Sequence, residues 1–325
     1  MPKFGETSHH LAWSAPTERR NGSSDRTSTL SMSGRTRKLT ESNAMQIAPE
    51  CAPCVYLQLT RTLEHRGVTD YLPIQRDVML ALGTNWDRYE TPAIAIDEMY
   101  RVANRATHQT DAYTAEKTRA NELAEHFWAD HVVPVENLSQ RLVYACAANI
   151  IDAGLDANPE YLFTQLEGAI EQGLGVDHSP IFWSRLPNKA RLLYITDNAG
   201  EVVFDRELMR SLRYHGYHLS VLVRHHAFLN DVTRDDVHQV GLSQVANKIL
   251  DLGDHFTLWA MRDDMLDMWA KEYDGFIIKG IANLESLSHR LLPRPALFLY
   301  RAKCPPAARV AAAQWNDNVA WYQNR

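Results

Sequence analysis

The chain has 325 residues, of which 45% are hydrophobic and 23% are charged, and its formal net charge is −6 at pH 7. This composition is typical of a globular protein with one large domain or two, and the negative charge excludes the basic surface that binds nucleic acid. No apolar run is long enough to span a membrane, and four cysteines are too few for a disulfide scaffold, so we expect a reduced cytoplasmic setting.

The first 44 residues differ in composition from the rest of the chain. They are rich in Ser, Thr and Arg, contain few aliphatic residues and show no periodicity. A segment of this kind buries too little apolar surface to offset the entropy that ordering removes. We therefore expect residues 1–44 to be a disordered extension or a mis-assigned start. A transit peptide is disfavoured, because the segment carries acidic residues.

Residues 45–188 carry mainly helical patterns and are expected to form a helical domain. Apolar side chains recur at helical spacings from Tyr56 to Leu63, and charged and apolar residues alternate with a helical period over residues 116–128. Residues 141–151 predict a more continuously apolar helix. Few strand signals precede residue 190, so we expect the sheet to lie in the rest of the chain.

Residues 189–325 carry short apolar runs that alternate with helical stretches and turn residues. The runs are residues 192–196, 219–223, 248–252, 275–278 and 296–300. Strands and helices that alternate at this spacing form βαβ units, which build a mostly parallel sheet. We therefore predict an α/β fold with a doubly wound, Rossmann-like sheet in residues 189–325. The helical domain would pack on this sheet or wrap around it.

Asp197 and Asn198 directly follow the first of these runs, and residues 206–214 predict a helix after them. The two side chains would then lie at the carboxyl end of a strand, where open α/β sheets bind ligands. Carboxylate and amide oxygens suit a hard divalent cation. Gly200 would let a phosphate approach the amino end of the helix, where free N–H groups favour an anion. The segment predicts a metal and a phosphate in one place.

Asp231 follows the next predicted strand, which is residues 219–223. If the two strands are neighbours, Asp197, Asn198 and Asp231 converge at one edge of the sheet. Three oxygen ligands together with water suit an octahedral ion such as Mg²⁺ or Mn²⁺. The alternative is that Asp231 belongs to a turn and Asp197 caps a helix, because Asp is common in both positions.

Further charged and amide side chains are expected near the same edge. Lys279 and Lys303 each lie at the end of an apolar run, where an ammonium can neutralise a phosphate. The alternatives are an ordinary turn at Lys279 and a solvated side chain at Lys303. Asn149 and Asp152 lie at the end of the apolar helix of residues 141–151, where they either reach the site across the domain interface or cap the helix.

Cys51 and Cys54 form a Cys-x-x-Cys pair near the start of the first predicted helix. The pair is open to three interpretations: part of a structural metal site, a redox pair, or two inert thiols. A tetrahedral zinc site would need further ligands, and only Cys146, Cys304 and scattered histidines are available.

Together these segments resemble the damage-control phosphatase family, which is related to the acidic-residue methyltransferase-1-like proteins. The motifs occur in family order over residues 45–306, and the Cys-x-x-Cys start resembles the prokaryotic branch of the family. They are Cys51-Ala52-Pro53-Cys54, Asp111-Ala112-Tyr113 with Lys117 and Asn121, Asn149-Ile150-Ile151-Asp152, Asp197-Asn198-Ala199-Gly200-Glu201, Asn230-Asp231-Val232-Thr233, Lys279-Gly280 with Asn283 and Glu285, and Arg301-Ala302-Lys303-Cys304.

The resemblance implies a metal-dependent phosphatase that acts on phosphate monoesters of small metabolites, with sugar phosphates and damaged phosphometabolites as suspected substrates. The implied cofactor is a divalent ion: Mn²⁺, Co²⁺, Ni²⁺ or Mg²⁺. Asp197, Asn198 and Asp231 match the metal ligands, and Lys279 matches a phosphate-contacting lysine, so these four are the candidate catalytic residues. Either a water molecule or Asp197 is the nucleophile. The positions that match the family's pocket are Asn149, Asp152, Glu201, Asn283 and Glu285.

The sequence departs from the family pattern at Ala148, where glycine is common, and at Ile281-Ala282, where more polar residues are common. Neither departure removes a ligand, and the second bears on the choice of substrate. Two other functions stay open. A carboxyl methyltransferase would need a glycine-rich loop, and residues 197–201 lack its spacing. A non-catalytic metal or redox protein would be built around Cys51 and Cys54.

Overall fold

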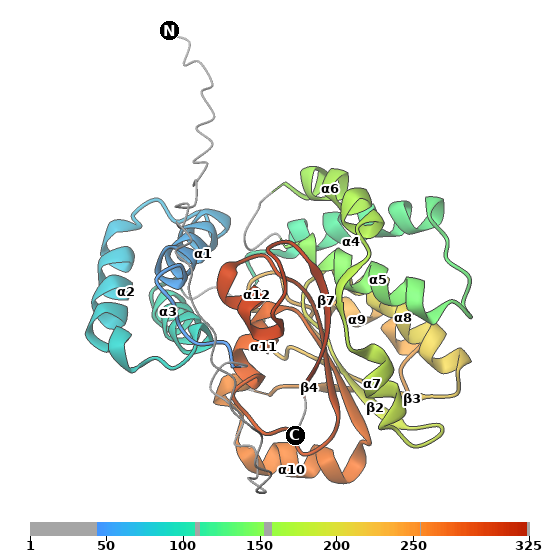
Figure 1. The fold of residues 1–325 in the computed structure, drawn as a ribbon. Coiled ribbons are helices and arrows are strands. Elements are labelled where there is room, and N and C mark those ends of the chain that lie inside the picture. Colours follow the sequence, from blue (N-terminus) through green and yellow to red (C-terminus); the bar gives the residue numbers. More distant parts are fainter. Residues whose placement is uncertain (1–43, 108–110, 153–157, 254, 324–325) are drawn as a thin grey trace, which may run out of the picture. The chain divides into compact units, whose positions relative to one another are not determined.

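The structure, a computed structural model, describes residues 44–107, 111–152, 158–253 and 255–323 (Figure 1). These residues belong to a single unit that spans Leu39–Arg325. The segment predicted to be a disordered extension or a mis-assigned start, residues 1–44, lies outside the described residues except for Ala44. No helix in the described ranges is long and apolar enough to cross a membrane.

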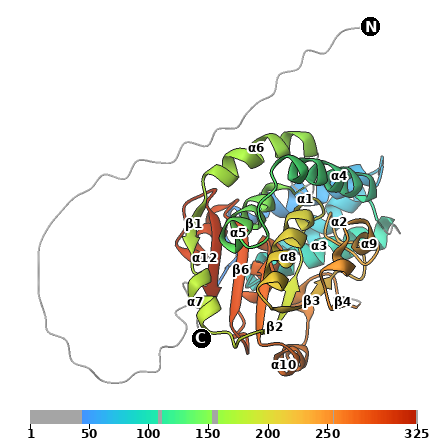
Figure 2. The same cartoon turned by 90° about the vertical axis from the view of Figure 1, so that its right-hand side faces the viewer.

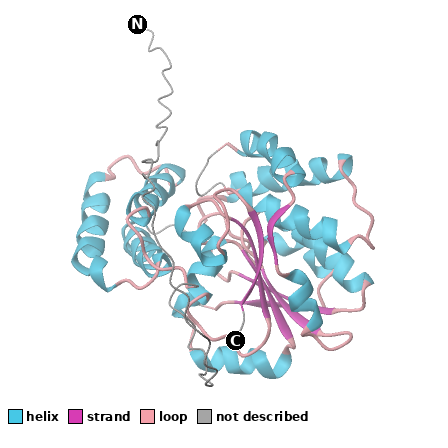
Figure 3. Cartoon of the chain, in the orientation of Figure 1, coloured by secondary structure: helices cyan, strands magenta, loops and turns pink. Residues whose placement is uncertain are grey.

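In the part of the chain that the structure describes, seven strands form one sheet in the order β1-β7-β6-β5-β2-β3-β4. Figure 3 shows the strands in magenta, with helices around them. The strands are β1 (Leu174–Asp177), β2 (Arg191–Ile195), β3 (His218–Val223), β4 (Lys248–Asp251), β5 (Gly275–Lys279), β6 (Ala296–Arg301) and β7 (Asn318–Gln323). All neighbouring pairs are parallel except β6 and β7. The sheet confirms the predicted α/β fold, in which a mostly parallel sheet is covered by helices.

The five apolar runs predicted as strands correspond to β2–β6. Strands β2, β5 and β6 are buried almost throughout, as expected for parallel strands that are covered on both faces. The sequence does not predict β1 and β7. In β1, partly buried and exposed side chains alternate, so this segment lacks the apolar run that marks a buried strand. Strand β1 lies on the helical side of the predicted domain boundary at residue 188, and that boundary stays a prediction.

Helices cover both faces of the sheet, and the side chains of each strand alternate between two apolar clusters. The helices in the second half of the chain are α7 (Ser179–Ser184), α8 (Glu201–Tyr214), α9 (Asp236–Gln239), α10 (Asp263–Glu272), α11 (Ile281–Leu287) and α12 (Pro305–Ala311). In β2, Leu192 and Tyr194 pack into the cluster that contains residues of α8, whereas Leu193 and Ile195 pack into the cluster that contains residues of α10, α11 and α12. Figure 2 views the sheet from the side that α8 covers.

Among the described residues, the amino-terminal half supplies six α-helices, which contribute to two further apolar clusters. These helices are α1 (Cys51–His65), α2 (Leu72–Asn85), α3 (Pro92–Thr107), α4 (Thr114–Asp130), α5 (Leu138–Ala147) and α6 (Pro159–Glu171). Short 3-10 helices are η2 (Trp86–Arg88), η3 (Ala148–Ile150), η4 (Leu242–Gln244) and η5 (Leu258–Ala260). Helices α1–α3 share a cluster with Phe228 and Leu229, which follow β3, and α4–α6 share one with α8. In Figure 1, α1–α3 and α4–α6 lie on opposite sides of the sheet.

Gly200 lies in the turn between β2 and α8 and has a φ of +78°, which residues with a side chain rarely adopt. A Cβ atom at this position would lie 2.8 Å from Ile151 Cγ2 and 2.9 Å from Ala120 Cβ. Because Ala120 belongs to α4 and Ile151 follows η3, the start of α8 packs closely against both elements. Glycine is therefore required at this position for packing as well as for backbone conformation.

The replacement Gly200→Ala is expected to lower the free energy of unfolding by about 1–3 kcal/mol, because it adds both backbone strain and overlap with Ala120 and Ile151. Urea unfolding measures the change. Gly168→Ala is the matched control, since nothing lies within 4 Å of a Cβ atom at Gly168 in α6. That control is expected to raise the free energy of unfolding by about 0.5–1 kcal/mol. A Gly200→Ala protein as stable as the wild type would contradict this account.

Candidate active site

The turns after β2 and β3 pair with each other at the carboxyl ends of the strands. Asn198 and Asp231 form an antiparallel bridge, the Val232 N–H donates to the Asp197 carbonyl at 2.9 Å, and the Ala199 N–H donates to the Asn230 carbonyl at 2.9 Å. Strands β2 and β3 are neighbours in the sheet, as the sequence analysis requires. The structure therefore brings the three predicted metal ligands, Asp197, Asn198 and Asp231, to one place.

These three side chains line a cavity of about 140 Å³. Its polar wall consists of Asp152, Asp197, Asn198, Asp231, Glu285 and Lys303. Among the described residues that line the cavity, four carry a carboxyl group and one carries an ammonium. If all five groups are ionised, the cavity holds an excess of three negative charges. Such an excess in a buried site favours either protonation of the carboxyl groups or binding of a cation.

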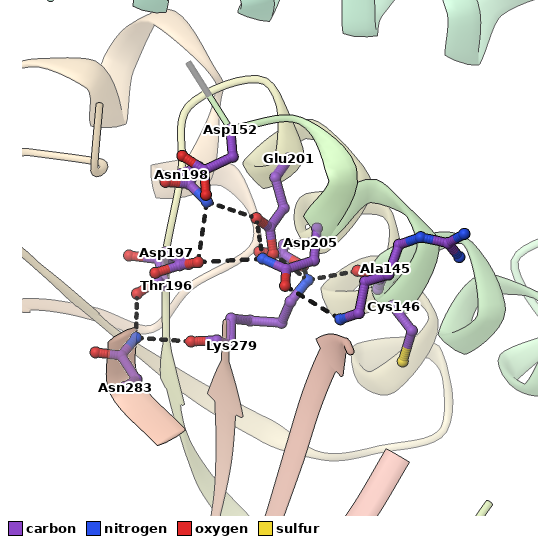
Figure 4. A network of polar contacts seen from close by, with 12 residues as sticks. Ala145, Cys146, Asp152, Thr196, Asp197, Asn198, Glu201, Asp205, Lys279 and Asn283 are labelled. Atoms are coloured by element: carbon purple, nitrogen blue, oxygen red, sulfur yellow. Dashed lines mark hydrogen bonds and ion pairs between the residues drawn. The ribbon is translucent and has the colours of Figure 1, made fainter. Parts of the chain in front are cut away.

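Asp197 is buried and has one oxygen without a hydrogen bond. Its Oδ2 accepts from Asn149 Nδ2 at 3.1 Å and from Asn198 Nδ2 at 2.9 Å (Figure 4). Its Oδ1 has no hydrogen-bond partner among the described residues. Burial, followed by repulsion from Asp231 and Glu201, raises the pKa of the Asp197 carboxyl well above its ordinary value. A buried oxygen of this kind is a suitable ligand for a cation that the chain itself does not supply.

Gly280 lets the backbone after β5 pass directly beside the Asp197 carboxylate. Its φ is +78°, and a Cβ atom at this position would lie 1.7 Å from Asp197 Oδ2. A side chain at residue 280 would therefore occupy the space of the carboxylate. Glycine at residue 280 thus allows the end of β5 to lie against Asp197.

Asp231 is held by an arginine that the sequence analysis did not identify. Arg224 Nε donates to Asp231 Oδ2 at 2.6 Å. Burial raises the pKa of Asp231 to about 6, although Arg224 acts in the opposite direction. Arg224 also donates to Asn283 Oδ1 at 3.1 Å, and Asn283 Nδ2 donates to the carbonyls of Thr196 at 2.9 Å and Lys279 at 2.7 Å. Asn283 thus connects the ends of β2, β3 and β5 and does not line the cavity.

Lys279 is fully buried beneath the cavity and does not line it. Its ammonium lies 2.7 Å from Glu201 Oε1, donates to Asp205 Oδ1 at 2.7 Å and donates to the Ala145 carbonyl at 2.5 Å (Figure 4). Burial lowers the pKa of this lysine, but Asp205 and Glu201 more than offset that effect and raise it. Because three protein acceptors surround the ammonium, the geometry does not support the predicted contact between Lys279 and a phosphate.

Glu201 and Asn149 connect Lys279 to Asp197. Glu201 Oε2 accepts from Asn149 Nδ2 at 2.9 Å and from Asn198 Nδ2 at 3.2 Å. Asn149 Oδ1 in turn accepts from the Arg301 N–H at 3.1 Å. Neither Glu201 nor Asn149 lines the cavity, although both were predicted to do so. From outside the cavity, they hold the side chains of Asp197 and Asn198 in place through hydrogen bonds.

Lys303, which the sequence places at the end of an apolar run, and Glu285, which matches the family's pocket, both line the cavity, and Lys303 pairs with Asp152. Lys303 Nζ donates to Asp152 Oδ2 at 2.6 Å. Glu285 Oε2 is buried without a hydrogen-bond partner among the described residues. Burial raises the pKa of Glu285 to about 8, and Lys303 acts in the opposite direction. Lys303 is thus the cationic side chain in this wall, among the residues that the structure describes.

Gly200 lies outside the cavity lining, and its N–H donates to Asn121 Oδ1 at 2.6 Å. The structure therefore does not support the predicted role of Gly200 in admitting a phosphate. The physical reason is that α4, which carries Asn121, already occupies that side of the turn.

Cys51 begins α1, and Cys54 lines the cavity together with Cys304. Burial raises the pKa of the Cys54 thiol to about 12 and also raises that of Cys51. Within the described ranges, no three His, Cys, Asp or Glu side chains are grouped so that they could hold a metal ion. The predicted ligand set at Asp197 is not such a group, because one of its three members, Asn198, is an asparagine. A metal or redox role of Cys51 and Cys54 stays a prediction, and protonated thiols do not favour it.

Two contributors to the site were missed in the sequence analysis. Arg224 directly follows β3, in the same position after its strand as the predicted residues. Asp205 lies four residues after Glu201 in α8, so both carboxyl groups share one face of the helix. Asp205 also accepts from Tyr194 Oη at 2.8 Å. The four-residue spacing of two acidic residues in an otherwise buried helix was a signal that could have identified this pair.

Comparison with known proteins gives consistent matches along most of the chain. A family model described as the damage-control phosphatase ARMT1-like domain matches residues 47–319. An uncharacterized protein of Methanocaldococcus jannaschii is 25% identical, over 85% of this chain and 95% of that protein. A damage-control phosphatase of Pyrococcus horikoshii is 26% identical over 82% of this chain and 94% of its own length. One from Archaeoglobus fulgidus is 26% identical over 85% of this chain and 99% of its own length.

A solved structure has the same fold. The crystal structure of a DUF89 family protein from Pyrococcus horikoshii matches 85% of this chain and 98% of its own, with a TM-score of 0.70 and 24% sequence identity. At this identity, the likeness of the two structures supports the fold alone. The family model, however, spans residues 47–319, which include the strands that carry the site. The chain therefore belongs to the damage-control phosphatase family.

Proposed function

We propose that this protein is a divalent-metal-dependent phosphatase that hydrolyses phosphate monoesters of small metabolites, sugar phosphates or damaged phosphometabolites among them. The observation that carries the proposal is the cavity with four carboxyl groups and one ammonium, in which Asp197 Oδ1 has no hydrogen-bond partner among the described residues. A phosphate ester carries negative charge and would be repelled by these carboxylates. A bound cation would remove the repulsion. The names of the relatives from Pyrococcus horikoshii and Archaeoglobus fulgidus support the same activity.

Asp197, Asn198 and Asp231 are the residues that would hold the ion. Two carboxylates and an amide oxygen form a hard donor set, which suits Mg²⁺, Mn²⁺, Co²⁺ or Ni²⁺. The raised pKa values of Asp197 and Asp231 fit this role, because an ion that replaces the protons relieves the repulsion between the two groups. When bound, such an ion neutralises charge on phosphoryl oxygens and lowers the pKa of a coordinated water.

The chain's own residues would bind and orient the ester. Asn149 and Asn198 fix the Asp197 carboxylate through hydrogen bonds to Oδ2, which leaves Oδ1 available. Arg224 fixes Asp231 in the same way. Lys303 is the ammonium that can reach phosphate oxygens from the cavity wall, and it would exchange part of its contact with Asp152 for the phosphate. The attacking group is either a water molecule or Asp197.

Replacing Asp197 by Asn is expected to reduce phosphate release from 4-nitrophenyl phosphate with Mn²⁺ by at least about a hundredfold, because the change keeps the shape but removes a ligand charge. Chelation of the metal is expected to abolish the activity of the wild type. Asp267→Asn, at an exposed position in α10, is the matched control and should retain full activity. Normal turnover by the Asp197→Asn protein would contradict the proposed site.

Lys279 and Lys303 are expected to respond differently when each is replaced by Met. Lys279→Met leaves Glu201 and Asp205 buried without their cation, so the free energy of unfolding should fall by about 3–5 kcal/mol. Lys303→Met should destabilise the fold much less, because Lys303 and Asp152 both retain contact with solvent, and should chiefly raise KM. Urea unfolding and steady-state kinetics separate the two results. The reverse pattern would show that Lys279 is the phosphate ligand.

The stability of the metal-free protein is expected to fall as pH rises, because Glu285 holds its proton more tightly when folded. Its pKa is raised from 4.5 to about 8, so its contribution is fully present below about pH 4.5 and is lost as pH rises through about 8. Glu285→Gln should reduce the fall between pH 5 and 8 by at least about 1 kcal/mol. Thermal unfolding in the presence of a chelator measures the slope. Glu171→Gln, at the exposed end of α6, should leave it unchanged.

A further inference from the structure

The cavity has a second wall that is unlike the polar one. It consists of Cys54, Ile96, Phe228, Leu229, Ile281 and Ala282, which come from α1, α3, the turn after β3 and the start of α11. Ile96, Phe228 and Leu229 belong to the apolar cluster that α1–α3 form. Gln58 also lines the cavity, and Gln58 Oε1 and Glu285 Oε2 of the polar wall are buried without a hydrogen-bond partner among the described residues. The six side chains of the second wall themselves carry no oxygen or nitrogen atom, so this wall offers few polar atoms to a ligand.

Leu229 occupies this wall at the expense of backbone strain. Its φ is +48°, in the left-handed region that Asn and Gly adopt more readily than Leu. Its N–H donates to Tyr100 Oη at 3.4 Å, and the same hydroxyl donates to the Ala227 carbonyl at 3.4 Å. The ring of Phe228 packs 4.9 Å from that of Tyr100. Contacts from α3 thus hold a strained apolar residue against the cavity, and strain of this kind concentrates at ligand sites.

The size of the cavity restricts the ligand further. Its volume of about 140 Å³ lies below the range of about 300–1,000 Å³ that is usual for sites of drug-sized ligands. A phosphate at the polar wall would occupy part of this volume. The space that remains adjoins the apolar wall, so it suits a short organic group.

We infer that, among the phosphate monoesters proposed above, the preferred substrate has a short and mainly apolar organic group. Leu229 and Ile281 are specificity-determining residues that favour it over polyhydroxylated esters, sugar phosphates included. The inference rests on the proposed phosphatase function. Each methylene that enters the apolar wall is removed from water, which favours binding. A hydroxyl that loses its water there without a hydrogen-bond partner disfavours binding. The two effects act in the same direction.

Two esters with the same three-carbon chain test the selection. 1-Propyl phosphate and glycerol 3-phosphate are both alkyl esters and differ by two hydroxyl groups. With Mn²⁺, the wild type is expected to show a kcat/KM for 1-propyl phosphate at least about tenfold higher than for glycerol 3-phosphate. Release of inorganic phosphate measures both rates. A wild type that prefers glycerol 3-phosphate would overturn the inference while leaving the phosphatase function intact.

The replacement Leu229→Asn places an amide in the wall and suits the left-handed backbone, so the variant is expected to fold. It should reduce the ratio of the two kcat/KM values about tenfold. Ala312→Asn is the matched control, because Ala312 also has a left-handed backbone, with a φ of +53°, and does not line the cavity. That control should keep the wild-type ratio. Ile281→Asn repeats the test from α11, and an unchanged ratio in both wall variants would overturn the inference.

A different result would count against the proposed function itself. If neither ester releases phosphate with Mn²⁺, Co²⁺, Ni²⁺ or Mg²⁺, the phosphatase proposal is wrong for these substrates, and the selection is then scored by binding. Calorimetry with propylphosphonate and 2,3-dihydroxypropylphosphonate, which cannot be hydrolysed, measures it directly. Tighter binding of the propyl compound, reduced in Leu229→Asn, would support the inference. Equal binding, or tighter binding of the dihydroxy compound, would overturn it.

Discussion

The buried ammonium of Lys279 holds together the elements that build the site. It lies at the end of β5, between two carboxyl groups of α8 and beside a carbonyl of α5. Two buried carboxylates would destabilise the fold strongly without a cation between them. From Glu201, hydrogen bonds continue to Asn149 and Asn198 and then to Asp197. The position of the cavity-facing carboxylate therefore depends on an ion pair that a ligand in the cavity does not touch.

The sequence predicted that Asp197, Asn198 and Asp231 meet on the condition that their two strands are neighbours, which the structure shows. Each follows a strand, and parallel strands place their carboxyl ends at the same edge of a sheet. The three side chains therefore meet when β2 and β3 are adjacent in the sheet. The same reasoning misplaced Lys279, because the end of a strand does not state which face a side chain takes. Lys279 shares a face with Ile277, which packs into the cluster that contains α8 residues. Side chains alternate along a strand, so that alternation already indicated the buried direction.

The residues that the sequence left unassigned, or to which it gave another role, depend on contacts between distant segments. The N–H of Leu229 bonds to Tyr100, which lies 129 residues earlier in the chain. Gly200 is constrained by α4 and η3, and the role of its N–H follows from Asn121, 79 residues away. Motifs at strand ends identify the polar wall of the cavity. The apolar wall combines Cys54, Ile281 and Ala282, which lie in or beside motifs, with Ile96, Phe228 and Leu229, which the sequence does not single out. The packed structure is needed to show that these residues meet.

Gly280 shows how few amino acid replacements the end of β5 can accept. The space of its absent side chain is filled by the Asp197 carboxylate, 1.7 Å from where a Cβ atom would lie. Every amino acid that a single nucleotide change can substitute for glycine carries a Cβ atom. Each missense change at this codon therefore meets the same obstacle, whatever the chemistry of the new side chain. A single replacement at residue 280 is therefore disfavoured, and the residue can change only if Asp197 changes with it.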